Sequence, residues 1–234
     1  MTVTESVERR APAQDTWPLF GIRLTTPRLE LRVVDDSLIP ELARVARDGI
    51  HEPDHMPFGN SWTDRPDEDW HTGFARYFWR QRGSWDVNSW SLPFAVLADG
   101  APIGVQQLTA EDFPVLRAFG TGSWLSLAHH GQGLGTEMRA AVLHFGFRVL
   151  GAELAVTGAF PSNKGSIRVS EKIGYLQNGV RRDRVRGRPV DSVLFRLPRE
   201  LWESSRAVPV EVEGFEGCER LFGLDAAHEE AGLA

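Results

Sequence analysis

The feature that most constrains this chain is a run of alternating glycines at the start of a predicted helix. The segment 129–137 has the sequence HHGQGLGTE and follows an apolar run at 124–127. Glycine lets the main chain turn freely and approach a bound group closely. The start of a helix adds unpaired N–H groups and the positive end of the helix dipole. The sequence therefore predicts an anion-binding loop, for which phosphate is a natural ligand.

The spacing of these glycines differs from that of two familiar phosphate loops. A P-loop ends in Gly-Lys-Ser/Thr, whereas Gly135 is followed directly by Thr136. A dinucleotide-binding loop has the pattern Gly-x-Gly-x-x-Gly near the start of a parallel sheet. Here the pattern is Gly-x-Gly-x-Gly in mid-chain, after a predicted antiparallel meander. The alternative interpretation is a tight strand-to-helix turn that binds nothing.

Composition limits the classes of protein to consider. A net charge of −6 argues against a nucleic-acid binder, and 41% hydrophobic residues suffice for the core of one domain. The single cysteine, Cys218, excludes a disulfide within the chain and favours a reducing cytoplasm. No apolar run approaches the roughly 18 residues of a membrane span. Residues 1–15 lack the apolar core of a signal peptide, so we expect a cytoplasmic protein without a membrane anchor.

Hydrophobic periodicity predicts alternating strands and helices. The expected strands cover 22–24, 29–33, 92–97, 103–108, 118–127, 154–159, 179–185 and 190–197, and the expected helices cover 36–47, 66–83, 134–150 and 162–172. The strand–loop–helix–strand unit over 124–159 suits a parallel crossover. We therefore expect a mixed α/β domain over 17–204, a flexible N-terminus over 1–16 and an acidic C-terminal tail over 205–234.

Aromatic residues and a polar loop precede the glycine segment. Six of the eight tryptophans lie between Trp62 and Trp124, which fits either a tryptophan-rich core or an aromatic wall around a substrate cleft. A loop over 50–65 contains His51, Glu52, Asp54 and His55. Two histidines with carboxylates can bind a metal, but their spacing matches no zinc pattern, and we expect no metal.

The glycine loop resembles motif A of the GNAT acyltransferases, Gln/Arg-x-x-Gly-x-Gly/Ala. His130, Gly133 and Gly135 stand at the marked positions. His130 replaces the usual first residue, which is a mild departure because main-chain N–H groups do most of the work in such a loop.

Three further segments are similar to one branch of that family, the branch that acetylates ribosomal-protein N-termini. They are NKGSIRVSEKIGY at 163–175, LTTPRL at 24–29 and DSVLF at 191–195. The resemblance covers residues 20–200, with the motifs in the expected order. Actinobacterial succinyltransferases of the family are similar in further segments, namely WPLF at 17–20, DHMPF at 54–58, WSLP at 90–93 and GSWL at 122–125.

The resemblance implies the GNAT fold, a mixed sheet splayed between two parallel strands, with the pantetheine arm of coenzyme A between 122–127 and 154–159. Loop N–H groups would hold the pyrophosphate. The implied cofactor-binding residues are Leu125, Leu127, His130, Gly131, Gln132, Gly133, Leu134, Gly135, Thr136, Asn163, Lys164 and Ser166. Lys164, Arg168 and Lys172 would neutralise the adenosine phosphates or, alternatively, remain solvated helix charges.

The implied reaction is direct attack of an amine on a coenzyme A thioester in a ternary complex. The leaving thiolate needs a proton donor, for which Ser166 and Tyr175 are candidates. Alternatively, Ser166 bonds within its helix and Tyr175 belongs to the core. Glu111 and Asp112 follow a central strand and are candidates for the base, unless they are solvated loop carboxylates. N–H donors on the strand at 125–127 would stabilise the tetrahedral intermediate.

The donor stays open between acetyl-CoA and succinyl-CoA. A succinyl carboxylate needs a cation, and the candidates are Arg76, Arg80, Arg82, Arg117, Arg181, Arg182, Arg184, Arg186 and Arg188. The acceptor would be a protein N-terminus, a lysine or a small amine such as an antibiotic. The alternative functions are a non-catalytic CoA-binding or regulatory module and a plain structural domain. Because related enzymes are often oligomers, we expect a homo-oligomer, with Cys218 at an exchanged edge or in a disordered tail.

Overall fold

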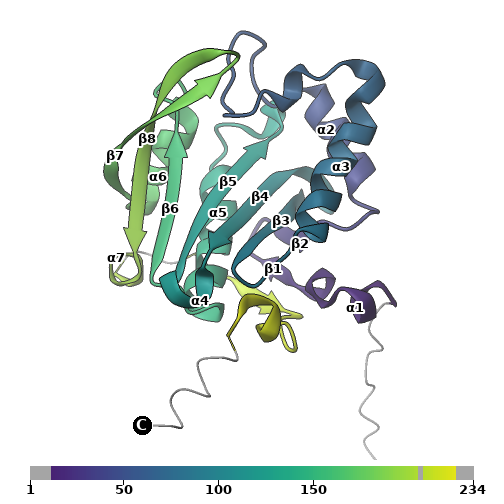
Figure 1. Ribbon diagram of the computed structural model, residues 1–234, viewed down its shortest axis with the longest axis vertical. Helices are drawn as coiled ribbons and strands as arrows, with labels where there is room; N and C mark the ends of the chain where they lie inside the picture. The colour runs from purple at the N-terminus through teal and green to yellow at the C-terminus, as the bar shows by residue number, and fades with distance from the viewer. Residues whose placement is uncertain (1–11, 205–207, 225–234) are drawn as a thin grey trace, which may run out of the picture.

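The computed structural model describes residues 12–204 and 208–224, which form a mixed sheet with helices on both faces (Figure 1). The strand order is β7-β8-β6-β5-β4-β3-β2-β1-β9. Within this order β5 and β6 run parallel, and the other neighbours are antiparallel. The mixed α/β class and the parallel crossover predicted from the sequence are confirmed.

Eight of the strands in the described residues lie where the alternation of apolar and polar residues predicts them. The strands are β1 (Arg23–Thr25), β2 (Glu30–Val33), β3 (Ser89–Ala98), β4 (Ala101–Glu111), β5 (Ala118–Leu125), β6 (Leu154–Ala159), β7 (Leu176–Val185), β8 (Arg188–Pro198) and β9 (Glu211–Glu213). The sequence did not predict β9, which pairs with β1. Cys218 and Phe222, which follow it, are fully buried in the core. Residues 208–224 therefore pack onto the domain, while 205–207 and 225–234 of the expected tail lie outside the described residues.

The main helices pack in two groups on opposite faces of the sheet (Figure 1). α2 (Ile39–Asp48) and α3 (Trp70–Gly83) cover one face, and α5 (Leu134–His144) and α6 (Lys164–Ile173) cover the other. The short helices are α1 (Pro12–Thr16), α4 (Phe113–Leu116) and α7 (Arg199–Glu203). Of the helices described, none is both long and apolar enough to cross a membrane.

The first turn of α6 differs from the sequence prediction. Ser162 was the expected N-cap, but the cap is Asn163, whose side chain accepts a hydrogen bond from the Ser166 N–H at 3.1 Å. Asparagine and serine are both good N-caps, so the sequence alone did not decide between adjacent residues.

The C-terminal end of α5 also differs from the prediction of a continuous helix to residue 150. The α-helix ends at His144 and continues as a π-helical turn, Phe145–Val149. Gly146 in this turn packs directly against the Phe119 ring of β5, because a Cβ atom there would lie 2.4 Å from a ring carbon. The glycine is thus required for close packing of the helix on the sheet.

Candidate functional site

The two parallel strands of the sheet part along their length. β5 and β6 pair over three rows, from Ala118 with Leu154 to Gly120 with Val156. Beyond Gly120, β5 stays paired with β4, and β6 stays paired with β8. The sheet is therefore split between residues 121–125 and 157–159, and Figure 1 shows the two strands diverging. We call this split the β5–β6 gap.

Main-chain groups of β5 face the gap. The Ser126 N–H donates to Ile103 O at 2.8 Å. This bond identifies which residues of β5 direct their main-chain groups toward β4. Because bonded pairs alternate along antiparallel strands, the N–H and C=O groups of Ser123 and Leu125 point away from β4 and toward β6. Strand groups that face such a gap can bind an extended chain as an added strand, and of these four groups the Leu125 carbonyl oxygen already has the His130 ring at 3.0 Å.

Leu127, which the sequence analysis placed beside the pantetheine arm, has its N–H engaged elsewhere. That N–H donates to Gly49 O at 3.0 Å, at the end of α2. His130 Nε2 lies 3.0 Å from Leu125 O, so its ring also contacts the end of β5. The structure thus places Ser123, which the sequence analysis did not select, on the gap with Leu125.

The alternating glycines form the turn between the 3-10 turn η4 (Leu127–His129) and α5. Gly131 and Gly133 have φ values of 75° and 81°, which glycine adopts without strain. Within 12–204 and 208–224, the N–H groups of residues 131–133 donate no main-chain hydrogen bond. In the first turn of α5, the Thr136 N–H donates to Gly133 O at 3.1 Å, whereas the N–H groups of Leu134 and Gly135 have no helical partner, as at any helix start. The loop follows the open end of the gap, so these donors are available to an anion there.

A clamp from the start of β2 holds this loop. Arg28 Nη1 donates to Gln132 O at 3.0 Å, and Arg28 Nε donates to Glu137 Oε2 at 2.7 Å. The buried Glu137 carboxylate also accepts a bond from the Thr26 hydroxyl at 2.7 Å. A negative charge in the first turn of α5 would repel a bound anion, and Arg28 offsets it. Sequence reasoning missed this clamp because its residues are 109 positions apart and share no local pattern.

α6 borders the site from the β6 side. Its N-cap, Asn163, follows β6 after a short turn, and a Cβ atom at Gly135 would lie 3.5 Å from Val169 Cγ2 of this helix. Lys164, Arg168 and Lys172 are exposed along α6. The cations expected to meet the adenosine phosphates therefore share a helix that packs on the glycine loop.

Tyr175 follows α6 and enters the core at the gap. The residue is 6% exposed, and its hydroxyl lies near Thr121 and Arg139 without a well-formed hydrogen bond to any described residue. Burial raises the pKa of the Tyr175 hydroxyl, and the Arg139 charge opposes this in part. The hydroxyl is therefore protonated at neutral pH. Ser166 is half-buried in the first turn of α6, where its N–H completes the helix cap.

Glu111 and Asp112 lie at the end of β4 that is remote from the glycine loop. Thr109 of β4 is opposite Gly120 of β5, so Glu111 is level with the rows where β5 and β6 still pair, and Asp112 follows it away from the open end. Glu111 accepts a hydrogen bond from the Ser89 hydroxyl at 3.0 Å. The structure does not bring these two residues together with the other candidates.

The 50–65 loop reaches across the open end of the gap (Figure 1). Asp64 accepts hydrogen bonds at 2.6 and 2.8 Å from Arg186, which lies in the turn between β7 and β8. The Arg186 guanidinium holds the pKa of Asp64 below its usual range. His55 Nε2 lies 3.2 Å from the Ser162 hydroxyl, in the turn between β6 and α6. The loop, the hairpin and this turn therefore border the same opening.

The aromatic cluster combines both interpretations made from the sequence. Trp70 and Phe74 are buried, whereas Trp62 and Trp124 are half-buried, and the Trp62 and Trp124 ring centroids are 6.1 Å apart. Next to Trp124, a Cβ atom added at Gly122 would meet no atom within 4 Å. The α3 side of the gap is therefore open and bounded by aromatic rings. Among the residues described, no group of three or more His, Cys, Asp or Glu side chains is arranged to hold a metal.

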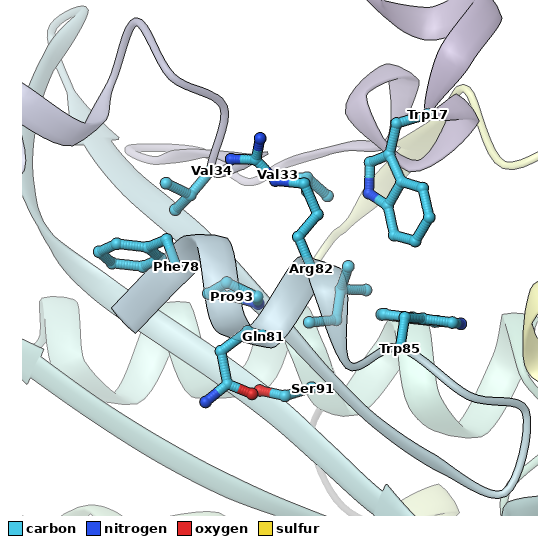
Figure 2. A pocket seen from close by; sticks show the side chains of 10 residues that line it. Trp17, Val33, Val34, Phe78, Gln81, Arg82, Trp85, Ser91 and Pro93 are labelled. Carbon is cyan, nitrogen blue, oxygen red and sulfur yellow. The ribbon is translucent and has the colours of Figure 1, made fainter. Parts of the chain in front are cut away.

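A separate hollow lies between the N-terminal segment and α3. Its lining residues are Trp17, Val33, Val34, Phe78, Gln81, Arg82, Trp85, Ser91, Leu92 and Pro93 (Figure 2). Arg82 extends across it, donates to Asp36 at 3.0 Å and lies 4.9 Å from the centre of the Phe20 ring. No lining residue belongs to β5, β6 or the glycine loop, so this hollow is not part of the candidate site.

Two comparisons use the sequence. The model of the acetyltransferase (GNAT) domain matches residues 28–176. The probable N-acetyltransferase YjcK of Bacillus subtilis (strain 168) is 37% identical over 65 residues, which cover 28% of this chain and 36% of that protein. The chain thus matches about a third of that curated relative's length.

Two solved structures share the fold. RimJ of Mycobacterium smegmatis, solved in complex with CoA-disulfide, has a TM-score of 0.67 at 22% identity and covers 82% of this chain and 91% of its own. RimL, a ribosomal L7/L12 alpha-N-protein acetyltransferase solved with coenzyme A, has a TM-score of 0.59 at 15% identity. The match covers 75% of this chain and 97% of the RimL chain. The family model spans more than half of the chain, and this protein therefore belongs to the acetyltransferase (GNAT) domain family.

Proposed function

We propose that this protein is an N-acyltransferase that moves an acetyl or succinyl group from coenzyme A to a primary amine. The observation that carries the proposal is the β5–β6 gap, which leads directly into the glycine loop. The pantetheine arm carries amides that can pair like an added strand, and the pyrophosphate is an anion that suits the helix start.

The donor contacts follow from this placement. Main-chain groups of Ser123 and Leu125 would pair with the pantetheine amides. The N–H groups of residues 131–135 would hold the pyrophosphate, with the Arg28 clamp keeping Glu137 neutralised. Asn163 would border the pantetheine. The adenosine phosphates would meet the cations of α6, which are Lys164, Arg168 and Lys172.

The chemistry is transfer of the acyl carbon from sulfur to nitrogen. The neutral amine attacks the thioester carbonyl carbon, a C–N bond forms, the C–S bond breaks and its electron pair leaves on sulfur. Tyr175 is the stronger candidate to protonate the thiolate because its hydroxyl is protonated and lies beside Thr121 on the gap, and Ser166 is the alternative. Glu111 and Asp112 lie at the closed end of the β5–β6 gap. Because of this distance, they would accept the amine proton only through intervening water.

The acceptor would approach from the α3 side, where Gly122 faces open space and Trp124 and Trp62 bound the opening. Protein N-termini, lysines and small amines all carry the required group, and the RimL relative is named for a protein N-terminus. We further propose a homo-oligomer, because edge strand β7 exposes Leu176 and Val180. A monomer in light scattering would contradict that part.

Calorimetric titration with coenzyme A tests the donor site, with Gly131→Asp as the variant and Gly151→Asp as its matched control. Both glycines have positive φ, 75° and 69°, and a Cβ atom at either meets nothing within 4 Å. Gly151 lies beyond the other end of α5, so only Gly131→Asp adds a charge to the loop. We expect Gly131→Asp to weaken coenzyme A binding at least tenfold, about 1.4 kcal/mol, and Gly151→Asp to leave it unchanged.

Release of thiol from acetyl-CoA or succinyl-CoA in the presence of amines then tests catalysis. Turnover with any amine supports the enzyme. Tight binding without turnover against peptides, lysine and small amines would favour the non-catalytic CoA-binding module. Equal loss of binding in both glycine variants, or no binding by the unmodified protein, would contradict the proposed donor site.

A further inference from the structure

A buried arginine without a carboxylate lies behind the β5–β6 gap. Arg139 of α5 is 3% exposed, and none of the ion pairs among the described residues includes it. Arginine keeps its charge in proteins, and a buried charge is costly unless it is paired. Arg139 is not among the cations selected from the sequence, which lie on the second helix and near the strands that border the acceptor side.

The Arg139 guanidinium reaches across both sides of the gap. Its three nitrogens lie 3.5 Å from Thr157 Oγ1 of β6, 3.4 Å from Ser123 Oγ of β5 and 3.4 Å from Gln106 Oε1 of β4. N–H···O hydrogen bonds are normally 2.7–3.2 Å long, so these contacts are weak. All three partners are neutral. The charge of Arg139 is therefore balanced by no anion among the described residues.

Two buried hydroxyls gather at the same place. Thr121 Oγ1 and Tyr175 Oη are buried and make no hydrogen bond to a described residue. The Tyr175 hydroxyl lies close to both Thr121 and Arg139. The Thr157 hydroxyl of β6 donates to Thr121 O of β5 at 3.0 Å, across the gap. Buried polar groups normally have partners, so a cation and two hydroxyls with poor or no bonds mark a site for a polar ligand.

We propose that Arg139 binds the distal carboxylate of a dicarboxylic acyl group, so that the donor is the mono-CoA thioester of a short dicarboxylic acid. This inference rests on the proposed function, because it requires a CoA thioester in the gap. A guanidinium presents a planar fork of donors that matches a carboxylate in two parallel hydrogen bonds. The Thr121 hydroxyl adds a donor beside it. An acetyl group offers this cluster no negative charge.

The arginines considered from the sequence fit this role less well. Arg186 pairs with Asp64, Arg181 pairs with Asp183, and Arg82 pairs with Asp36. These three are partly exposed, so water screens their charge. Arg139 is buried and has no anionic partner in the described part of the chain. It also contacts both strands that border the gap, β5 and β6.

The first experiment uses the unmodified protein and compares acetyl-CoA, butyryl-CoA and succinyl-CoA by calorimetry. Butyryl and succinyl both carry four carbons, and only succinyl ends in a carboxylate. We expect succinyl-CoA to bind at least tenfold more tightly than butyryl-CoA. Equal affinities would overturn the inference while leaving the proposed acyltransferase intact. Failure of all three thioesters and of coenzyme A itself to bind would overturn both.

The second experiment uses Arg139→Met, with Arg148→Met as the matched control. Arg148 follows α5, pairs with Glu203 and stacks on Trp202 at 5.3 Å, away from the gap. Arg139→Met should abolish the preference for succinyl over butyryl while keeping the affinity for coenzyme A, and Arg148→Met should keep the preference. Persistence of the preference in Arg139→Met would overturn the assignment. If Arg139→Met does not fold, the comparison of thioesters on the unmodified protein still decides.

Discussion

The two halves of the β5–β6 strand pair differ in chemistry as well as in geometry. In the closed half, Phe119 packs on Phe147 with ring centroids 5.4 Å apart, and Ala155 opposite is fully buried. In the open half, the hydroxyls of Thr121, Ser123 and Thr157 lie on the same face, and Arg139 contacts those of Ser123 and Thr157. Apolar side chains are stabilised by packing against each other, whereas buried polar groups need partners. The change from phenylalanine to threonine and serine along β5 therefore coincides with the change from a paired sheet to a binding gap.

The largest effect should come from breaking the closed half. Phe119→Ala removes a fully buried ring and should lower the free energy of unfolding by about 3–5 kcal/mol, measured by urea denaturation. Phe119→Leu keeps the site apolar and should cost clearly less. Coenzyme A affinity of the folded variants should change little, because the ring lies outside the gap. If Phe119→Ala lost coenzyme A binding but kept its free energy of unfolding, the separation of a structural closed half from a binding open half would be wrong.

Removing a hydroxyl from the open half should reduce turnover without weakening donor binding. Tyr175→Phe should lower kcat about 100-fold, at the low end of general acid catalysis, with KM for the acyl-CoA nearly unchanged. The control is Tyr77→Phe, which removes the other tyrosine hydroxyl of the chain, bonded to Gln107 at 2.7 Å. Since burial raises the pKa of Tyr175, its proton is retained through neutral pH and lost only above the usual value of about 10. Equal kcat values for both variants would assign the proton donor elsewhere.

Breaking the clamp behind the glycine loop should have an intermediate effect on binding. Arg28→Met leaves the Glu137 carboxylate uncompensated beside the bound phosphates, so coenzyme A should bind about tenfold more weakly, or about 1.4 kcal/mol. The double variant Arg28→Met/Glu137→Gln removes both charges and should recover part of that loss. If calorimetry shows that the double variant binds coenzyme A no better than Arg28→Met does, repulsion by Glu137 does not cause the loss of affinity.

The smallest effect should come from the α6 cap. Asn163→Ala removes the acceptor for the Ser166 N–H and should lower the free energy of unfolding by about 1 kcal/mol. Asn163→Asp keeps an acceptor and should lose less stability, although its charge should weaken coenzyme A binding. Thermal unfolding and calorimetry on the same two variants separate the structural role of Asn163 from its place at the donor site.

Much of this fold was predictable because its signals are local. The glycine spacing and the strand alternation each act over a few residues, and the structure has strands where the alternation predicts them, for example β3 and β4. β9 was missed because a strand of three residues carries almost no periodicity, and its stability comes from pairing with β1. Contacts between distant segments, such as Arg28 with Glu137, have no signature in one sequence.

Arg139 shows a different limit of sequence reasoning. It lies between buried Met138 and Ala141 on α5, and such a lone cation in an apolar helical run is a usable signal. The significance of that signal depends on which strands lie opposite, and only the three-dimensional arrangement gives Thr157 and Ser123 as its neighbours. Likewise, the distance of Glu111 from the glycine loop follows from the antiparallel direction of β4, not from its position after a central strand.

A crystal structure with coenzyme A tests the central claim most directly. We predict that the pantetheine arm lies between β5 and β6, bonded to the main chain of Ser123 and Leu125, with the pyrophosphate on the N–H groups of residues 131–135. Coenzyme A bound outside the gap, for example in the hollow beside Arg82, would contradict the account, as would a complex in which β5 and β6 pair along their full length.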